Sequence, residues 1–327
     1  MGPVSLLLSV AVRVLVTGIS WFVGHHLAAL LRSEGHDVWG LVLSSDEVIP
    51  EGVTTIPGDV TDLAAVRAAF ATARPEGVVH LAGASSVGAS FADPIGTWHV
   101  NLDGTLSVLE AARGLDVVPR IVTITSGEVY GQVPVDELPV RIDTPMNPDS
   151  PYGASKAAAD LAATQYALSF DVPVLRVRAF NHIGPGQDAR FVVPSIARQL
   201  ALAEVRGDDR ATLELGNLST RRDFTDVRDM VRAYLRILEA GDPSTPYLAC
   251  SGASRPIQSL VDTLVACSPL TVEITQDAGR VRSGEQPDLY GSPDALEALG
   301  WTPTIPIEQT LSDTLAWWRE RVTTEGA

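Results

Sequence analysis

The sequence predicts an α/β protein with a doubly wound parallel sheet and a smaller C-terminal domain that binds the substrate. Short runs of β-branched residues alternate with helical stretches over about the first 170 residues, as parallel strands and their crossover helices do. A glycine-containing turn follows the first of these runs, and beyond Phe180 the alternation becomes irregular. We therefore predict one domain over residues 12–180 and a second over residues 181–327, with a return of the chain to the first domain around residues 226–252.

Composition narrows the classes of function. The chain has 327 residues, of which 45% are hydrophobic, and a formal net charge of −16, which disfavours binding to nucleic acid or to an anionic membrane. The two cysteines, Cys250 and Cys267, lack metal-site spacing and suit a reducing compartment. No apolar run is long enough to span a bilayer, and the apolar N-terminus lacks the basic region of a signal peptide. We expect a cytoplasmic protein without a bound metal.

Residues 12–16 are predicted to form the first buried strand, and residues 17–24 a turn into a helix that Gly35 ends. Such a turn brings backbone N–H groups and the positive end of a helix to the pyrophosphate of a dinucleotide. In the expected Gly-x-x-Gly-x-x-Gly pattern, Trp21 replaces the middle glycine, so its ring either narrows the approach to the phosphate or lies over the adenosine. The cofactor contacts expected from this turn are Gly18, Ser20, Trp21, Phe22, Val23 and Gly24.

The second predicted strand, residues 37–43, ends without a charged residue. An acid at this point binds the ribose hydroxyls of NAD, whereas a basic residue accommodates the 2′-phosphate of NADP. The missing acid favours NADP, with NAD left possible, and makes Ser44 a candidate phosphate contact. Asp59 and Val60 follow a glycine where a carboxylate would meet the adenine amino group; a helix N-cap region before Leu63 is an equal alternative.

Two further strands are predicted at residues 77–81 and 120–125, with a helix between them at residues 94–114. Small residues after the first of these strands leave room for the nicotinamide ribose, so we expect contacts from Leu81, Ala82 and Gly83. Ser126 ends the second strand, and reactive groups of parallel sheets lie at the carboxyl ends of strands.

Tyr152 and Lys156 are the strongest candidates for chemistry. They are four residues apart in an alanine-rich helical stretch, which puts both side chains on one helix face. Lys156 is the only lysine of the chain. Because a neighbouring ammonium favours tyrosinate, we expect Lys156 to lower the pKa of Tyr152 and make it a proton-transfer group.

Polar loops dominate the remaining chain, at residues 181–187, 216–226 and 280–287. Guanidinium groups bind diphosphate through paired hydrogen bonds, and an acidic chain needs them locally to hold a nucleotide. The candidates are Arg221, Arg222, Arg280 and Arg282, with ordinary surface ion pairs as the alternative for each.

The Tyr-x-x-x-Lys pair, Ser126, the glycine turn and the arginine loops together resemble the extended short-chain dehydrogenase/reductases that act on nucleotide sugars. The resemblance extends over nearly the whole chain from about Val12, and residues 180–187, 216–229 and 250–252 are similar to the GDP-6-deoxy-4-keto-D-mannose reductases of that family. It implies a Rossmann domain in which Ser126, Tyr152 and Lys156 are catalytic, and Gly18, Gly24, Asp59 and Lys156 hold the cofactor. The substrate contacts that it implies are Ser85, Glu128, Asn181, Val193, Arg222, Arg282 and Glu285.

The implied reaction is NADPH-dependent reduction of a nucleotide-linked 4-keto-6-deoxyhexose, with GDP or dTDP as the nucleotide. A 4-epimerase or 4,6-dehydratase that retains NAD is the alternative. Gly127 stands where dTDP-glucose 4,6-dehydratases have an aspartate, which argues against that activity, but Glu128 leaves dehydration open. The Tyr/Lys pair disfavours a non-catalytic dinucleotide-binding protein. The alanine-rich helix at residues 154–169 and the helix at residues 94–114 predict a four-helix interface in a homodimer.

Overall fold

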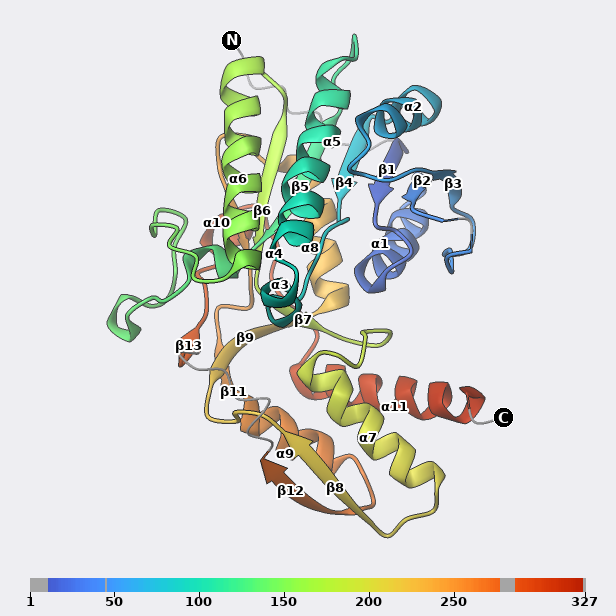
Figure 1. Ribbon diagram of the computed structural model, residues 1–327, viewed down its shortest axis with the longest axis vertical. Coiled ribbons are helices and arrows are strands. Elements are labelled where there is room, and N and C mark those ends of the chain that lie inside the picture. The colour runs from blue at the N-terminus through green and yellow to red at the C-terminus, as the bar shows by residue number, and fades with distance from the viewer. Residues whose placement is uncertain (1–10, 45, 277–285, 326–327) are drawn as a thin grey trace.

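The computed structural model describes residues 11–44, 46–276 and 286–325, arranged as two lobes (Figure 1). The larger lobe is built on a seven-stranded sheet with the order β10-β6-β5-β4-β1-β2-β3, in which every strand pair is parallel. The predicted doubly wound α/β fold is confirmed. The strands are β1 (Arg13–Thr17), β2 (Asp37–Val42), β3 (Thr54–Pro57), β4 (Gly77–His80), β5 (Arg120–Ser126), β6 (Val174–Ala179) and β10 (Tyr247–Ala249).

Helices cover both faces of this sheet because successive strand residues point to opposite sides. Val14 and Val16 of β1 pack in the core beneath α1 and α8, whereas Leu15 between them packs in the core beneath α2, α5 and α6. The continuous apolar runs of the strands follow from this burial on two sides. These helices are α1 (Phe22–Ser33), α2 (Leu63–Ala73), α5 (Gly104–Arg113), α6 (Pro151–Phe170) and α8 (Val227–Ala240).

The helix predicted over residues 94–114 is interrupted. A short α3 (Val87–Ala92) is followed by α4 (Pro94–Trp98), a wide π-helical turn (His99–Asp103) and then α5. Asp93 accepts a hydrogen bond from Gly96 N at 2.9 Å and begins α4. Such π turns are rare and occur frequently at functional sites, and this one carries the buried Asn101.

The smaller lobe lies below the sheet in Figure 1 and has its own hydrophobic core, formed by α7, α9 and α11 with β8. Two small sheets belong to it: β8 pairs with β12, and β9 pairs with β7, β11 and β13. The elements of the smaller lobe are α7 (Val192–Val205), α9 (Ile257–Ala266), α11 (Ile307–Glu325), β7 (Asn181–Ile183), β8 (Arg210–Leu215), β9 (Arg221–Asp226), β11 (Ser254–Pro256), β12 (Thr271–Gln276) and β13 (Asp288–Leu289). The short α10 (Asp294–Glu297) packs instead on the core of the larger lobe through Leu296, and 3₁₀ turns at Gly127–Tyr130 and Val135–Glu137 follow β5.

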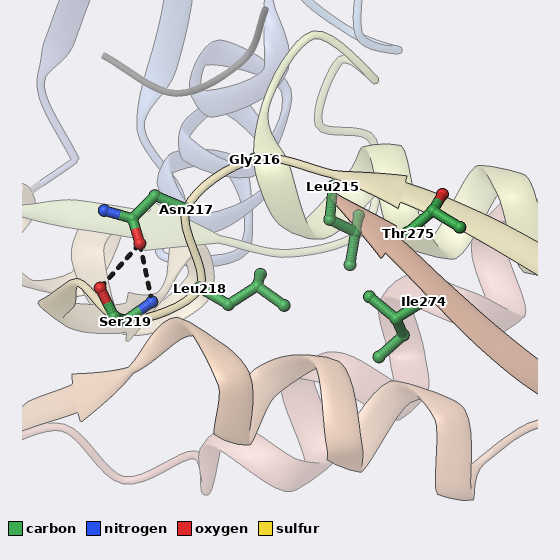
Figure 2. A pocket seen from close by; sticks show the side chains of 7 residues that line it. All are labelled: Leu215, Gly216, Asn217, Leu218, Ser219, Ile274 and Thr275. Atoms are coloured by element: carbon green, nitrogen blue, oxygen red, sulfur yellow. Dashed lines mark hydrogen bonds between the residues drawn. The ribbon is translucent and has the colours of Figure 1, made fainter. Parts of the chain in front are cut away.

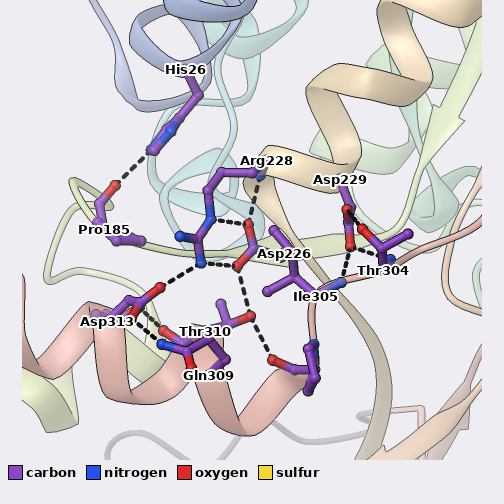
Figure 3. A network of polar contacts seen from close by, with 12 residues as sticks. His26, Pro185, Asp226, Arg228, Asp229, Thr304, Ile305, Gln309, Thr310 and Asp313 are labelled. Atoms are coloured by element: carbon purple, nitrogen blue, oxygen red, sulfur yellow. Dashed lines mark hydrogen bonds and ion pairs between the residues drawn. The ribbon is translucent and has the colours of Figure 1, made fainter.

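A polar network centred on the buried Asp226 joins the two lobes where β9 leads into α8 (Figure 3). Asp226 begins α8 by accepting a hydrogen bond from Arg228 N at 2.7 Å, and it also accepts one from Thr310 Oγ1 of α11 at 2.7 Å. Arg228 bridges Asp226 and Asp313, both at 2.7 Å. Since α8 packs on the sheet and α11 on the smaller lobe, these contacts fix how the two lobes meet.

Candidate active site

Tyr152 occupies the first turn of α6, at the end of the helix that faces the smaller lobe. Ser150 caps the helix by accepting a hydrogen bond from Gly153 N at 3.0 Å, and Pro151 has its fixed backbone angle in the first helical position. Ser90 Oγ accepts from Tyr152 N at 3.2 Å, so the short α3 holds this turn from the other side. Tyr152 and Lys156 are both buried on the same helix face.

The phenol of Tyr152 lies beside Ser126, the last residue of β5, and the two share a hydrogen bond. Ser126 Oγ also accepts from Glu128 N at 3.2 Å, which fixes the serine side chain at the strand end. Burial raises the pKa of Tyr152 to about 12, opposed by the Ser126 hydrogen bond and increased by the Glu128 charge. The expected lowering of this pKa is therefore wrong, because burial of the phenol raises the pKa and outweighs the opposing hydrogen bond with Ser126.

Lys156 contacts the backbone of β5. Its Nζ donates a hydrogen bond to Ile124 O at 3.0 Å, and burial lowers the pKa of its ammonium to about 8. A Cβ atom built on Gly83 would lie 3.0 Å from Lys156 Nζ and 2.8 Å from Asn101 Oδ1. The absence of a side chain at Gly83 thus leaves the space in which these two polar groups approach one another.

Asn101 was not assigned a role from the sequence. Its Nδ2 donates to Ser155 Oγ at 2.9 Å, but its buried Oδ1 has no hydrogen-bond partner among the described residues. A buried acceptor without a partner is costly unless water or a ligand completes it. The asparagine within a predicted helix was the only signal in the sequence, since asparagine is a poor helix former.

A hydrogen-bond chain through the buried His80 supports the π turn that carries Asn101. Thr105 Oγ1 donates its only proton to Asn101 O at 2.7 Å, so His80 Nε2, 3.2 Å away, is the donor to Thr105. His80 Nδ1 then accepts from Thr17 Oγ1 at 2.8 Å. Burial lowers the pKa of His80 to about 3, which keeps the imidazole neutral. These hydrogen bonds connect the ends of β1 and β4 to the π turn that carries Asn101.

The turn after β1 fits the pyrophosphate of a dinucleotide. Gly18 has φ +72°, and a Cβ atom on it would lie 2.8 Å from Ala82 N; a Cβ on Gly24 would lie 2.4 Å from Ile19 O. Both positions therefore require glycine, and the backbone N–H groups at the start of α1 remain close to any bound phosphate. Trp21 is 64% exposed, so its side chain points outward from the fold.

The adenosine end of this crevice differs from the prediction in one respect. Glu47 accepts hydrogen bonds from Ser20 Oγ and from Ser44 N, so an acid is present near the end of β2 although the sequence placed none there. Asp59 is exposed and accepts from Thr61 N at 2.8 Å, whereas Asp62 is the residue that caps α2. The helix N-cap expected before Leu63 is therefore present, at Asp62, and Asp59 lies three residues before it. The neighbouring Val60 is buried.

The stretches that carry the sequence resemblance are tied together by Asp223, which sequence reasoning did not single out. Its carboxylate is fully buried and accepts from Ser251 N at 2.7 Å and from Gly252 N at 2.9 Å. Burial raises the pKa of Asp223 to about 6. Asn181 Nδ2 donates to Asp223 O at 3.3 Å. Asp223 thus joins the three stretches that carry the sequence resemblance, since its carboxylate binds residues 251 and 252 and its backbone carbonyl binds Asn181.

The two arginines of β9 have different surroundings. Arg221 pairs with Asp288 at 3.4 Å and donates to Ser254 Oγ at 2.9 Å, which is the ordinary ion pair of the alternative interpretation. Arg222 is half-buried and donates through Nη1 to two backbone carbonyls, those of Arg221 and Gln286. Arg280, Arg282 and Glu285 lie outside the described residues.

Three other candidate substrate contacts have distinct environments. Ser85 is exposed, and Glu128 is half-buried beside Tyr152. Val193, by contrast, is fully buried in the core of the smaller lobe, so the structure removes its side chain from the candidate site. Val193 was predicted as a substrate contact because the sequence pattern does not reveal the tertiary packing that buries its side chain.

A cavity of about 360 Å³ lies in the smaller lobe, between the ends of β8 and β12 (Figure 2). Leu215, Leu218 and Ile274 point into it, and Asn217 forms its polar edge by accepting hydrogen bonds from Ser219 N and Oγ. None of its lining residues belongs to the group around Tyr152. In the described parts of the chain, no helix is long and apolar enough to cross a membrane, and no three acidic, histidine or cysteine side chains are grouped as metal ligands.

Comparisons with known proteins agree with this site. A model of the family described as GDP-mannose 4,6 dehydratase matches residues 15–314. The chain is 38% identical to the GDP-6-deoxy-D-mannose reductase of Pseudomonas aeruginosa over 315 residues, which cover 96% of this chain and 99% of that protein.

Solved structures show the same architecture. The structure of RMD from Pseudomonas aeruginosa complexed with NADPH has a TM-score of 0.84 and 36% identity, covering 95% of this chain and 100% of that one. The UDP-glucose 4-epimerase of Thermus thermophilus in complex with NAD also has a TM-score of 0.84, at 29% identity, covering 94% of this chain and 99% of that one. This chain belongs to the GDP-mannose 4,6-dehydratase family and is an NAD(P)-dependent oxidoreductase of the extended short-chain dehydrogenase/reductase type.

Proposed function

We propose that this protein is an NADPH-dependent 4-ketoreductase of a nucleotide-linked 4-keto-6-deoxyhexose, the substrate being a GDP- or dTDP-sugar. The observation that carries the proposal is the buried phenol of Tyr152, which is hydrogen-bonded to Ser126. Since burial raises its pKa, the phenol carries a proton at neutral pH that it can donate during reduction. Similarity to the reductase of Pseudomonas aeruginosa supports the same direction of reaction.

In this proposal, NADPH supplies the hydride for C4 when it is bound. Tyr152 donates its proton to the C4 oxygen as negative charge develops there, and Ser126 donates a hydrogen bond to the same oxygen. Lys156 lies between the carbonyl of Ile124 and Gly83, where its ammonium is positioned to bind the nicotinamide ribose. We further propose that the buried Oδ1 of Asn101, which has no hydrogen-bond partner among the described residues, binds a water beside this ammonium, and that the proton lost by Tyr152 is replaced from solvent through this water.

The nucleotide sugar then lies between the two lobes. We assign Asn181, Arg222 and Glu128 to its binding, since they come from the elements that border Tyr152 or the joined substrate loops. Residues 12–180 form the NADP-binding domain in this proposal, and residues 181–327 mainly bind the nucleotide sugar. We place the reaction in the cytoplasm, where Cys250 and Cys267, both free thiols here, remain reduced.

The decisive experiment follows NADPH oxidation with GDP- and dTDP-4-keto-6-deoxyhexoses generated by the matching dehydratases. We expect turnover with one nucleotide, and a loss of about 10²-fold or more in kcat for Tyr152→Phe. Tyr166→Phe is the matched control, because Tyr166 is on the same helix but bonds Glu110 at 3.0 Å. No oxidation with either sugar would overturn the proposal.

The alternative activity is a 4-epimerase or 4,6-dehydratase, which Glu128 favours because it places a carboxylate beside Tyr152. Those reactions begin with oxidation of the sugar, so Tyr152 must first accept a proton, and the cofactor is recycled without leaving. Extraction of the bound dinucleotide from the purified protein distinguishes the two functions. A dinucleotide that is released only on denaturation, together with no consumption of NADPH, would establish the alternative.

A homodimer is part of the proposal. The exposed sides of α4 and α6 carry large apolar groups: Ile95 is 79% exposed, Leu161 58% and Leu168 80%. The alanines Ala159 and Ala163, by contrast, are buried in the chain's own core, so they do not form the contact surface that the sequence suggested. Light scattering of the wild type and of Leu161→Glu tests this, with a dimer expected for the first and a monomer for the second.

A further inference from the structure

The carboxylate of Glu47 lies at the adenosine end of the proposed dinucleotide site. Ser20 belongs to the turn between β1 and α1, and Ser44 is the second residue after β2. Ser20 Oγ donates a hydrogen bond to Glu47 Oε2, and Ser44 N donates one to Glu47 Oε1 at 3.0 Å. In doubly wound folds the ribose hydroxyls of the adenosine meet the protein between this turn and the end of the second strand. Glu47 therefore occupies two hydrogen-bond donors that border that ribose.

The segment that carries Glu47 is held in place independently of its carboxylate. His25 Nε2, from α1, lies 3.1 Å from both Ser20 O and Val48 O. Because both partners are carbonyl oxygens, the Nε2 atom carries the proton and joins the glycine turn to the residue after Glu47. A substitution of the Glu47 side chain consequently leaves this backbone contact intact.

The charge of Glu47 is not balanced locally. Within the described part of the chain no ion pair involves Glu47, and the whole chain has a net charge of −16. A 2′-phosphate brought to this point would add negative charge beside a carboxylate and would compete with it for Ser20 Oγ and Ser44 N. A 2′-hydroxyl, by contrast, can donate a hydrogen bond to that carboxylate.

We propose that Glu47 determines how the protein discriminates between NADH and NADPH. With NADH, Glu47 keeps its contacts with Ser20 and Ser44 and accepts a hydrogen bond from the 2′-hydroxyl. With NADPH, Glu47 has to leave both donors so that the 2′-phosphate can take them. The inference rests on the proposed function and deepens it. Glu47 reduces the preference of the protein for NADPH over NADH, so that the protein accepts both cofactors.

Binding of adenosine fragments tests this without any catalysis. The dissociation constants of adenosine 2′,5′-bisphosphate and of 5′-AMP are measured by calorimetry for the wild type and for Glu47→Gln and Glu47→Ala. We expect both variants to bind the bisphosphate about tenfold or more tightly than the wild type does, with no gain for AMP. Asp46→Asn is the matched control, since Asp46 is an exposed acid next to Glu47, and its change should stay within about twofold.

Turnover provides the second readout. The ratio of kcat/KM with NADPH to kcat/KM with NADH should rise in Glu47→Gln by the same factor as the fragment affinity. The inference would be overturned if the affinities for both fragments changed equally, if the kcat/KM ratio stayed the same, or if Asp46→Asn gained the same affinity for the bisphosphate. None of these results would contradict the proposed ketoreductase activity. If the wild type and all variants bind neither fragment, the inference and the cofactor of the proposed function fail together.

Discussion

The side-chain oxygen of Asn101 and the ammonium of Lys156 meet at Gly83: a Cβ atom there would lie 2.8 Å from the first and 3.0 Å from the second. Asn101 comes from the π turn, Lys156 from α6 and Gly83 from the loop after β4. Three segments that are distant in sequence thus create one polar space around Gly83. The proton path and the ribose contact of the proposed reaction both depend on that space.

Gly83→Ala should lower kcat about tenfold or more, because its methyl group displaces the Asn101 oxygen, the Lys156 ammonium or both. The fold should remain, since the atoms that must move are the ends of side chains. Steady-state kinetics with circular dichroism measure both effects. Gly114→Ala is the control, as its Cβ would make only an ordinary contact of 3.5 Å. An unchanged kcat in Gly83→Ala would contradict the assigned roles.

Thr105→Val should reduce both stability and kcat, because it removes the acceptor of His80 Nε2–H and the donor to Asn101 O. The buried donor left on His80 lowers the free energy of unfolding by about 1–3 kcal/mol. Thr105→Ser keeps the hydroxyl and should restore kcat. Urea unfolding and steady-state kinetics of the two variants distinguish loss of these hydrogen bonds from loss of packing. If packing were the cause, the serine variant would be no more active than the valine variant.

Lys156→Met should stabilise the protein without ligands at neutral pH. Burial lowers the pKa of Lys156 from 10.5 to about 8, so the folded ammonium is unfavourable wherever it is protonated. Below about pH 8 the lysine is protonated in both the folded and the unfolded protein, and the buried ammonium lowers the free energy of unfolding by its full amount, up to about 3 kcal/mol. Between about pH 8 and 10.5 the unfolded protein binds more protons than the folded one, so this loss of stability declines as pH rises.

Urea unfolding at pH 7 and at pH 9.5 measures this effect. The stability gain of Lys156→Met over the wild type should be larger at pH 7. Lys156→Arg supplies the control, because a guanidinium stays charged at both values and its difference from Lys156→Met should not change with pH. A gain that grows with pH would refute the assignment.

Asp160→Asn should destabilise the protein by about 3–5 kcal/mol, since it leaves Arg178 buried without its counter-charge. Asp160 is fully buried and accepts from Arg178 Nε and Nη2, each at 3.0 Å. The exposed pair of Asp188 with Arg190 is the comparison, and Asp188→Asn should change the free energy of unfolding by less than about 1 kcal/mol. Equal effects of the two substitutions would show that the buried pair does not hold α6 to the sheet.

The sequence alone determined the features that depend on neighbours along the chain. The positions of Tyr152 and Lys156 on one helix face follow from helical periodicity, and the turn at Gly18 and Gly24 follows from backbone requirements that only glycine meets. The alternation of buried strands and helices likewise predicted the parallel sheet correctly, because burial on both faces leaves a pattern in every strand.

Tertiary structure decided what depends on contact between distant segments. Three contacts leave no periodic trace in the sequence: those of Asp223 with Ser251, of Glu47 with Ser44, and of Asn101 with the space beside Lys156. The pKa of Tyr152 shows the reason most clearly: a local pair predicted a decrease, but burial raises it to about 12. Removal of water is a property of the whole packed site, and no spacing of two residues specifies it.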